Sequence, residues 1–214
     1  MPRFLRLIPM ALTASVLLAA SPIDSGWANS PAYLQMLRVN RDVRSSVADI
    51  EVQTHLTSFP PVTLTFHGHS YFRAPDKQNV VFDDLPRMLS GMVKDSPSLL
   101  PAAAWPNRYD VAVVDSSVTH VAAFHVTPRD ANDPLESADV TVDDRTGLVS
   151  RFVFNNKNGS TVTTDQTYSQ VGKYEFLTAQ TGSARGPGYR AEVTTTFSNY
   201  RVNVRVPDSV FEKH

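Results

Sequence analysis

Apolar and polar residues alternate along much of the chain with the two-residue period of a β-strand. Val62, Leu64 and Phe66 alternate with threonine and histidine, which is typical of a strand with one buried face. From residue 108 onward the alternation recurs between turn sequences such as Asp143 to Gly147 and Asn156 to Gly159. The strands predicted in this part are 108–115, 118–127, 137–143, 147–155, 160–170, 173–181, 189–199 and 200–206.

Closely spaced strands joined by short turns favour an antiparallel meander. About ten strands in one sheet tend to curl or to close into a barrel. Gly68 interrupts the strand that begins at Val62, and a glycine inside a strand often marks a bulge. We therefore expect a mainly β (α+β) fold, built as one strongly curved antiparallel sheet.

Two segments have helical spacing instead. In the first, Asn29 or Ser30 caps a helix with Pro31 in its first turn, and the chain changes to strand spacing only from Asp49. The apolar face of this helix consists of Tyr33, Met36, Leu37, Val43 and Val47. In the second segment, 84–94, a single apolar stripe contains Leu85, Met88, Leu89, Met92 and Val93. Residues 95–106 are rich in proline and predict an irregular connection.

The first residues have the three parts of a secretory signal peptide. Arg3 and Arg6 form a basic start, residues 7–20 are uncharged and mostly apolar, and Gly26-Trp27-Ala28 fits the cleavage rule. The apolar run is shorter than the roughly 20 residues that cross a bilayer as a helix, which favours cleavage over a permanent anchor. We divide the chain into a signal peptide, 1–28, and a single domain, 29–214. Cleavage after Ala20 or Ser21 is the alternative.

The chain has no cysteine and a formal net charge of −1. Disulfides are therefore excluded, and so is the N-terminal cysteine that an acyl-anchored bacterial lipoprotein needs. The charge argues against nucleic acid as a partner, because phosphate binding requires a basic surface. No later segment is long and apolar enough to span a membrane.

Motifs for catalysis are missing from the sequence. The serine between Gly182 and Gly186 is misplaced for a nucleophile elbow, and there is no glycine-rich phosphate loop or dinucleotide fingerprint. Asp115, Ser116 and His120 are neighbours in the sequence, and such neighbours seldom form a triad. We expect no catalytic residue, no enzyme activity and no cofactor.

Four histidines are candidates for a metal site. His67 and His69 are two residues apart, so they would point to the same face of a strand and begin a zinc site. His120 and His125 would have to complete it, but they have opposite parity. The interpretation we favour is that these are exposed strand residues, and we predict no metal ligand.

The stripe at 84–94 packs on the sheet as part of the core, or it covers a cavity as a lid. A curved sheet with an apolar concave face and a mobile apolar cover would hold an acyl chain, because each buried methylene contributes about 0.8 kcal/mol. The predicted ligand-binding residues share strand parity or belong to the stripe: Val62, Leu64, Phe66, Phe72, Leu85, Met88, Leu89, Met92, Phe152 and Phe154.

Three segments, in this order, resemble the LolA-like superfamily of periplasmic lipoprotein and lipid carriers. They are the Gly-x-x-x-Phe-x-x-Pro-x-Lys turn at 68–77, the Asp-x-x-Thr-Gly hairpin within 142–152 and the closing Val-Pro-Asp-Ser-Val-Phe within 200–211. With the signal peptide and the amphipathic helix before them, they extend the resemblance over most of the domain, in pattern more than in identity.

The resemblance implies a curved, half-open antiparallel β-barrel with an N-terminal helix and a short lid helix. Members of the superfamily hold acyl chains in the concave face or use the same shell in envelope-stress sensing. In the lipoprotein carrier, a basic residue directly before the turn proline helps to keep the lid closed. Ala74 has that place here and Arg73 precedes it, so we expect Arg73 to point to the opposite face.

Together these patterns favour a non-enzymatic carrier or binding protein for a lipid or lipoprotein acyl group, located in the periplasm or secreted. The alternative is an envelope sensor or structural interaction module that binds a protein partner. We expect a monomer with no cofactor, no nucleic acid partner and no transmembrane segment after removal of the signal.

Overall fold

The computed structural model describes residues 25–57, 61–85 and 99–212. These residues form one ten-stranded antiparallel sheet with the strand order β3-β2-β1-β10-β9-β8-β7-β6-β5-β4. Strands that are neighbours in the sequence pair with each other, except for β3 and β4, which lie at opposite edges of the sheet. In addition, β1 pairs with β10 and so joins the two ends of the chain. Strands β3 and β4 are free edges, so the sheet is not closed. The expected mainly β, half-open architecture is confirmed.

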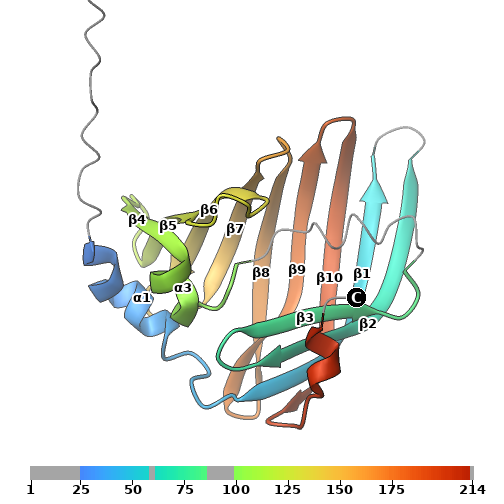
Figure 1. Ribbon diagram of the computed structural model, residues 1–214, viewed down its shortest axis with the longest axis horizontal. Helices are drawn as coiled ribbons and strands as arrows, with labels where there is room; N and C mark the ends of the chain where they lie inside the picture. The colour runs from blue at the N-terminus through green and yellow to red at the C-terminus, as the bar shows by residue number, and fades with distance from the viewer. Residues whose placement is uncertain (1–24, 58–60, 86–98, 213–214) are drawn as a thin grey trace, which may run out of the picture.

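The strands have the following bounds: β1 Ser45–Leu56, β2 Val62–Arg73, β3 Lys77–Phe82, β4 Tyr109–Val114, β5 Val121–Pro128, β6 Leu135–Asp143, β7 Val149–Asn156, β8 Thr161–Val171, β9 Tyr174–Gly186 and β10 Tyr189–Val202. Figure 1 shows that the sheet is strongly curved, with the hairpin of β2 and β3 crossing in front of the lower ends of the long central strands.

Short helices cover one end of the sheet, and we call the face they lie on the inner face. These are the 3-10 turn η1 (Ser25–Asn29), α1 (Pro31–Met36), the 3-10 turn η3 (Ala102–Ala104) and α3 (Trp105–Arg108). Figure 1 shows α1 and α3 beside β4 to β7. A further 3-10 turn, η4 (Asp208–Phe211), packs against β3 near the end of the chain.

Aromatic rings connect these helices to the sheet. The rings of Trp27 and Tyr33 meet edge to face with centroids 4.8 Å apart, and Trp105 meets Phe124 in the same way at 6.0 Å. The indole N–H of Trp105 donates to the carbonyl of Leu100 at 2.9 Å, so its burial leaves no polar group unpaired. The core below them is fully buried and consists of Phe124, Val126, Ala138, Val140 and Val142.

Two glycines allow the sheet to curve toward the inner face. A Cβ at Gly68 would lie 2.2 Å from the carbonyl oxygen of Val81, and one at Gly182 would lie 1.9 Å from that of Thr163. Only glycine permits such close approach of neighbouring strands. The expected bulge at Gly68 is wrong, because β1 and β2 pair without a register shift along their whole length. The glycine allows a bend rather than an extra residue.

The N-terminal helix is shorter than expected. It ends at Met36, and β1 already begins at Ser45. Asn40 has a positive φ of 51°, which ends helical geometry, and its side chain bonds to the backbone of Glu175 at 2.5 and 3.1 Å. Val43 and Val47 are both buried, but Val47 belongs to a strand, so their helical spacing was coincidental.

Two further predicted boundaries differ from the structure. The strand expected at 200–206 does not form separately, because β10 continues through a register shift opposite Val47 to Asp49 and ends at Val202. Asn199 has a positive φ of 52° at this shift, which is the backbone change that a bulge requires. The connection expected to be irregular contains η3 and α3 at its end.

Candidate functional site

Cross-strand pairing places the predicted ligand-binding residues of β2 and β7 on the same face. Residues that pair directly in antiparallel strands have their side chains on one face of the sheet. One apolar row crosses nine strands in this way and contains Val111, Val126, Ala138, Phe154, Val162, Ala184, Ala191, Leu56 and Val62. Its first four members lie in the core under the helices, so the whole row belongs to the inner face.

The other predicted strand residues follow the same alternation. Leu64 and Phe152 lie in the next row, which runs through Thr54, Val193, Gly182 and Thr164. Phe66 pairs with Val52 and Phe72 with Ser46, and the β1–β2 register is unbroken between them. All six predicted residues on strands therefore lie on the inner face.

Burial differs strongly along this face. Phe154 and Phe66 are 6% and 8% exposed, whereas Val62 at the far end of the row is 40% exposed. Phe152 stacks on Phe154 with ring centroids 5.2 Å apart, and Phe66 meets Phe82 edge to face at 6.3 Å. The apolar side chains between these pairs are half-buried, and they include Val162, Val193, Val52, Leu56 and Leu64.

The two clusters of buried residues have members only from η1, α1, α3 and β4 to β7 among the described residues. From β8 to β2 the inner face has buried residues such as Phe66 and Ala191, half-buried apolar residues such as Leu64 and Val193, and a few small or polar residues such as Thr54 and Thr164. Five strands spaced about 4.8 Å apart give this part a width of about 19 Å. Such a surface has no group suited to catalysis. Burial of its apolar part by an apolar chain would lower the free energy of the complex.

The predicted lid lies mostly outside the described residues. Leu85, its first apolar member, is described and is half-buried directly after the end of β3. Met88, Leu89 and Met92 fall within 86–98, which the described ranges omit. The lid helix therefore stays a prediction.

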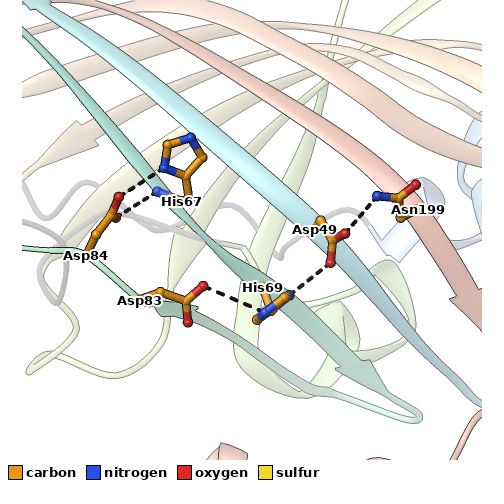
Figure 2. Close-up of polar contacts among 6 residues, drawn as sticks. All are labelled: Asp49, His67, His69, Asp83, Asp84 and Asn199. Atoms are coloured by element: carbon orange, nitrogen blue, oxygen red, sulfur yellow. Dashed lines mark hydrogen bonds and ion pairs between the residues drawn. The ribbon is translucent and has the colours of Figure 1, made fainter.

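A histidine and carboxylate cluster on the outer face was not predicted as a unit. His67 and His69 lie on the same face of β2, as their spacing predicts, and each has carboxylate partners from two other segments. Figure 2 shows His67 beside Asp84, and His69 with Asp49 and Asp83. The His67 ring lies 2.9 Å from Asp84 and 3.7 Å from Glu51 of β1. The backbone N–H of His67 also donates to Asp84, at 2.8 Å.

His69 has an equivalent pair of partners. Its ring lies 3.0 Å from Asp49 of β1 and 3.7 Å from Asp83 at the end of β3. Asn199 of β10 donates to the second oxygen of Asp49 at 2.8 Å, as Figure 2 shows. The cluster therefore connects β10, β1, β2 and the end of β3 across the outer face.

The contacts shift the acid–base equilibria of the cluster. The hydrogen bond to Asp84 raises the pKa of His67, and the same bond lowers the pKa of Asp84. The pKa of Asp49 is lowered first by its bond from Asn199 and then by His69. Within the described ranges, no three histidine or acidic side chains lie close enough together to hold a metal ion. The arrangement is suited to fastening the end of β3.

Sequence analysis missed the acidic members because their placement depends on register. Asp49 pairs with His69 and Glu51 with His67, and both pairs follow from the β1–β2 hairpin. Two acidic residues at spacing two, opposite two histidines at spacing two, were the signal. The segment was interpreted as a helix up to Val47, so the hairpin was not recognised.

Arg73 lies on the outer face, as its position one residue before Ala74 predicts. It pairs with Asp208, donates to the carbonyl of Val206 at 3.3 Å, and lies 4.9 Å from the centre of the Phe211 ring. These contacts hold the C-terminal segment rather than anything over the inner face. The basic residue that closes the lid in the lipoprotein carrier therefore has no counterpart at Arg73.

Comparison with known proteins gives the fold. No model of a known protein family matches the sequence, and no curated protein matches it. Solved structures do match. A DUF1329 family protein from Desulfovibrio piger has a TM-score of 0.60 at 15% identity, over 85% of this chain and 95% of its own. The fold is LolA-like.

Two further structures support this conclusion. A domain described as an outer membrane lipoprotein-sorting protein from Vibrio parahaemolyticus has a TM-score of 0.58 at 16% identity, covering 85% of this chain and 94% of its own. A LolA superfamily protein from Nitrosomonas europaea has a TM-score of 0.54 at 10% identity, covering 85% and 96%. At these identities the likeness extends to the fold alone. Among the described residues, no helix has the length and apolar character needed to cross a membrane.

Proposed function

We propose that this protein is a non-enzymatic carrier or binding protein for an acyl group of a lipid or lipoprotein in the cell envelope. The observation that carries the proposal is the part of the inner face over which no described helix lies, where half-buried apolar side chains continue the rows of the core. A water-soluble domain rarely leaves such a face open without a ligand or partner for it.

The comparisons support the proposal at the level of the fold. One of the structural relatives is described as a lipoprotein-sorting protein domain, and another as a member of the LolA superfamily. The proposed ligand contacts are Val62, Leu64, Phe66, Phe72, Phe152 and Phe154 from the sheet, with Leu85, Met88, Leu89 and Met92 as the cover. We place the protein in the periplasm as a monomer, after cleavage of its signal peptide.

Titration with an acyl-chain fluorophore tests this proposal. Leu64→Asp places a negative charge on the inner face of the sheet. Thr65→Asp, at the next residue of β2, places the same charge on the outer face. We expect Leu64→Asp to weaken binding of the probe at least about tenfold, because an acyl chain cannot solvate a carboxylate. Thr65→Asp should bind like the parent. Equal binding by all three proteins would contradict the proposal, and so would lack of binding by the parent.

A second function, an envelope interaction module for a protein partner, has one observation in its favour. Strand β4 is a free edge, and Val113 and Val114 on it are 51% and 44% exposed. An exposed apolar edge is a template for an added strand from another protein. The double variant Val113→Thr, Val114→Thr should bind the acyl probe like the parent, whichever of the two functions the protein has. A purified envelope partner that binds the parent and not this variant would favour the module.

A further inference from the structure

A basic groove lies at the end of the sheet where the chain folds back after β10. It lies between the end of β2 with its following turn and the segment 204–208, beside η4, which is red in Figure 1. The groove has a volume of about 570 Å³. Three arginines line it, Arg44, Arg73 and Arg205, together with one carboxylate, that of Asp208.

The single carboxylate is already shared by two cations. Asp208 pairs with Arg73, and Lys77 approaches it to 3.7 Å. Arg73 makes further contacts with the carbonyl of Val206 and the Phe211 ring, so its guanidinium is committed to holding the C-terminal segment. Its side chain is 27% exposed, which is consistent with a structural role.

The other two guanidinium groups have no such commitment. The backbone N–H of Arg44 donates to the Asn203 side chain at 2.7 Å, but no described residue pairs with the Arg44 guanidinium. The Arg205 guanidinium likewise has no partner among the residues that the structure describes, and both residues are exposed. The lining thus carries three positive charges against one negative charge, a surplus of two.

We propose that this groove binds a phosphate-class dianion, either free phosphate or a phosphate monoester of a larger molecule. Two guanidinium groups recognise phosphate oxygens through paired, charge-assisted hydrogen bonds, and a dianion neutralises the surplus of two charges. A single carboxylate would leave one charge unpaired. The groove is on the outer side of the β2 end, so this binding does not depend on the proposed acyl site.

Titration of 15N-labelled protein tests the proposal through the arginine Nε–H resonances. Sodium phosphate is added at about pH 7.5, where phosphate is mostly dianionic, and sodium chloride of equal ionic strength is the salt control. We expect saturable shifts of the Arg44 and Arg205 resonances with phosphate and none with chloride. Glycerol 3-phosphate, added in a parallel titration, separates the two sources: equal binding assigns the groove to monoesters, and weaker binding assigns it to free phosphate.

The double variant Arg44→Gln, Arg205→Gln should bind phosphate at least about tenfold more weakly, since both charge-assisted contacts are lost. Its matched control is Arg185→Gln, Arg190→Gln, which removes two exposed arginines that pair directly across β9 and β10. The control should bind like the parent. Shifts spread evenly over exposed arginines, or equal affinities in the two double variants, would overturn the proposal. If the first variant does not fold, the resonances of the parent protein decide alone.

Discussion

One face of one sheet is used in two ways. At the end formed by β4 to β7, helices cover the inner face and side chains such as Phe124 and Val140 have no exposed surface. From β8 to β2 the same rows continue with similar apolar residues, yet Leu64, Val162 and Val193 are only half-buried. Among the described residues, only the end from β4 to β7 has helices packed on this face. The covered end therefore holds the two clusters of buried residues, and the end from β8 to β2, which we call the open end, is the part that we propose binds the ligand.

The largest expected effect comes from the covered end. Phe124→Ala should lower the free energy of unfolding by about 4 kcal/mol, because it leaves a cavity in a fully packed core. Leu64→Ala at the open end should cost less, about 2 kcal/mol, since that side chain is only partly buried. Urea denaturation of both variants measures the contrast. Similar losses would mean that the two ends do not differ in packing as we conclude.

The next effect concerns the start of the mature protein. Trp27 is 6% exposed and packs on Tyr33, so it belongs to the core of the covered end although it precedes the expected cut after Ala28. A protein that begins at Asn29 should be less stable than one that begins at Ser21 by about 3 kcal/mol, as a lost core tryptophan costs. We therefore expect the alternative cut, upstream of Ser25.

Two measurements check this expectation. N-terminal sequencing of the exported protein should find a start at or before Ser25, and a start at Asn29 would contradict it. Trp27→Ala in the longer form should reproduce the lower stability of the shorter form in urea, since both lack the same side chain. If Trp27→Ala is as stable as the parent, packing of Trp27 gives no reason to expect the cut before Ser25.

The sequence alone predicted the covered end, β4 to β7, better than the open end, β8 to β2. Alternation and explicit turns were enough to predict most of the strands after residue 108, because each hairpin is local. The pairing of β1 with β10 joins the two ends of the chain and leaves no local signal, although it places Leu56 beside Ala191 on the inner face. The helical spacing of Val43 and Val47 even pointed the wrong way, since burial on one face satisfies a strand equally well.

The candidate sites show the same division. Strand parity predicted that Val62, Leu64 and Phe66 share one face of their strand and that Phe152 and Phe154 share one face of theirs, because this needs only the two-residue period. That the two sets lie on the same face of the sheet follows only from the pairing of all the strands between them. The outer cluster required the β1–β2 register. The arginine groove required knowing that the segment after β10 folds back beside Arg73, a contact between residues 135 positions apart in the sequence. Long-range contacts of this kind depend on the whole fold.

Curvature of the open end gives a third, smaller prediction. Gly68→Ala should lower the free energy of unfolding by about 2 kcal/mol, because the added methyl would meet the Val81 carbonyl of the edge strand. Ser70→Ala on the same strand adds no atom and serves as the control. Hydrogen exchange should show faster exchange in β3 than in β5 for the glycine variant. If β3 keeps the protection of the parent, the glycine is not what allows the bend.

The smallest effect concerns how the open end keeps its edge strand. The covered end holds β4 through buried residues such as Tyr109 and Val111, whereas β3 is fastened through the exposed His67 and its partners Asp84 and Glu51. The hydrogen bond to Asp84 raises the pKa of His67 above its usual value of about 6.5. Its contribution to stability is therefore fully present below about pH 6.5 and is lost as the pH rises through the folded-state pKa.

The partner carboxylate acts in the opposite direction. The pKa of Asp84 is lowered, so its contribution is present above its usual pKa of about 3.8 and is lost as the pH falls through the lower folded value. The carboxylates of Glu51 and Asp83 also raise the pKa of His67, less than Asp84 does. His69 lies beside this pair on β2 with its own partners Asp49 and Asp83. We call the interaction of His67 with Asp84 and Glu51, which fastens β3, the clasp. It should stabilise the protein most between about pH 4 and pH 6.5.

Thermal unfolding of His67→Gln tests the clasp. The parent should exceed the variant in Tm by more at about pH 5.5 than at about pH 8, because only the charged imidazole has the full interaction with Asp84 and Glu51. His55→Gln is the control, since the His55 ring contacts the neutral hydroxyl of Thr63 at 2.9 Å. A Tm difference that is the same at both pH values, or one that His55→Gln shares, would mean that packing alone holds the open end of the sheet.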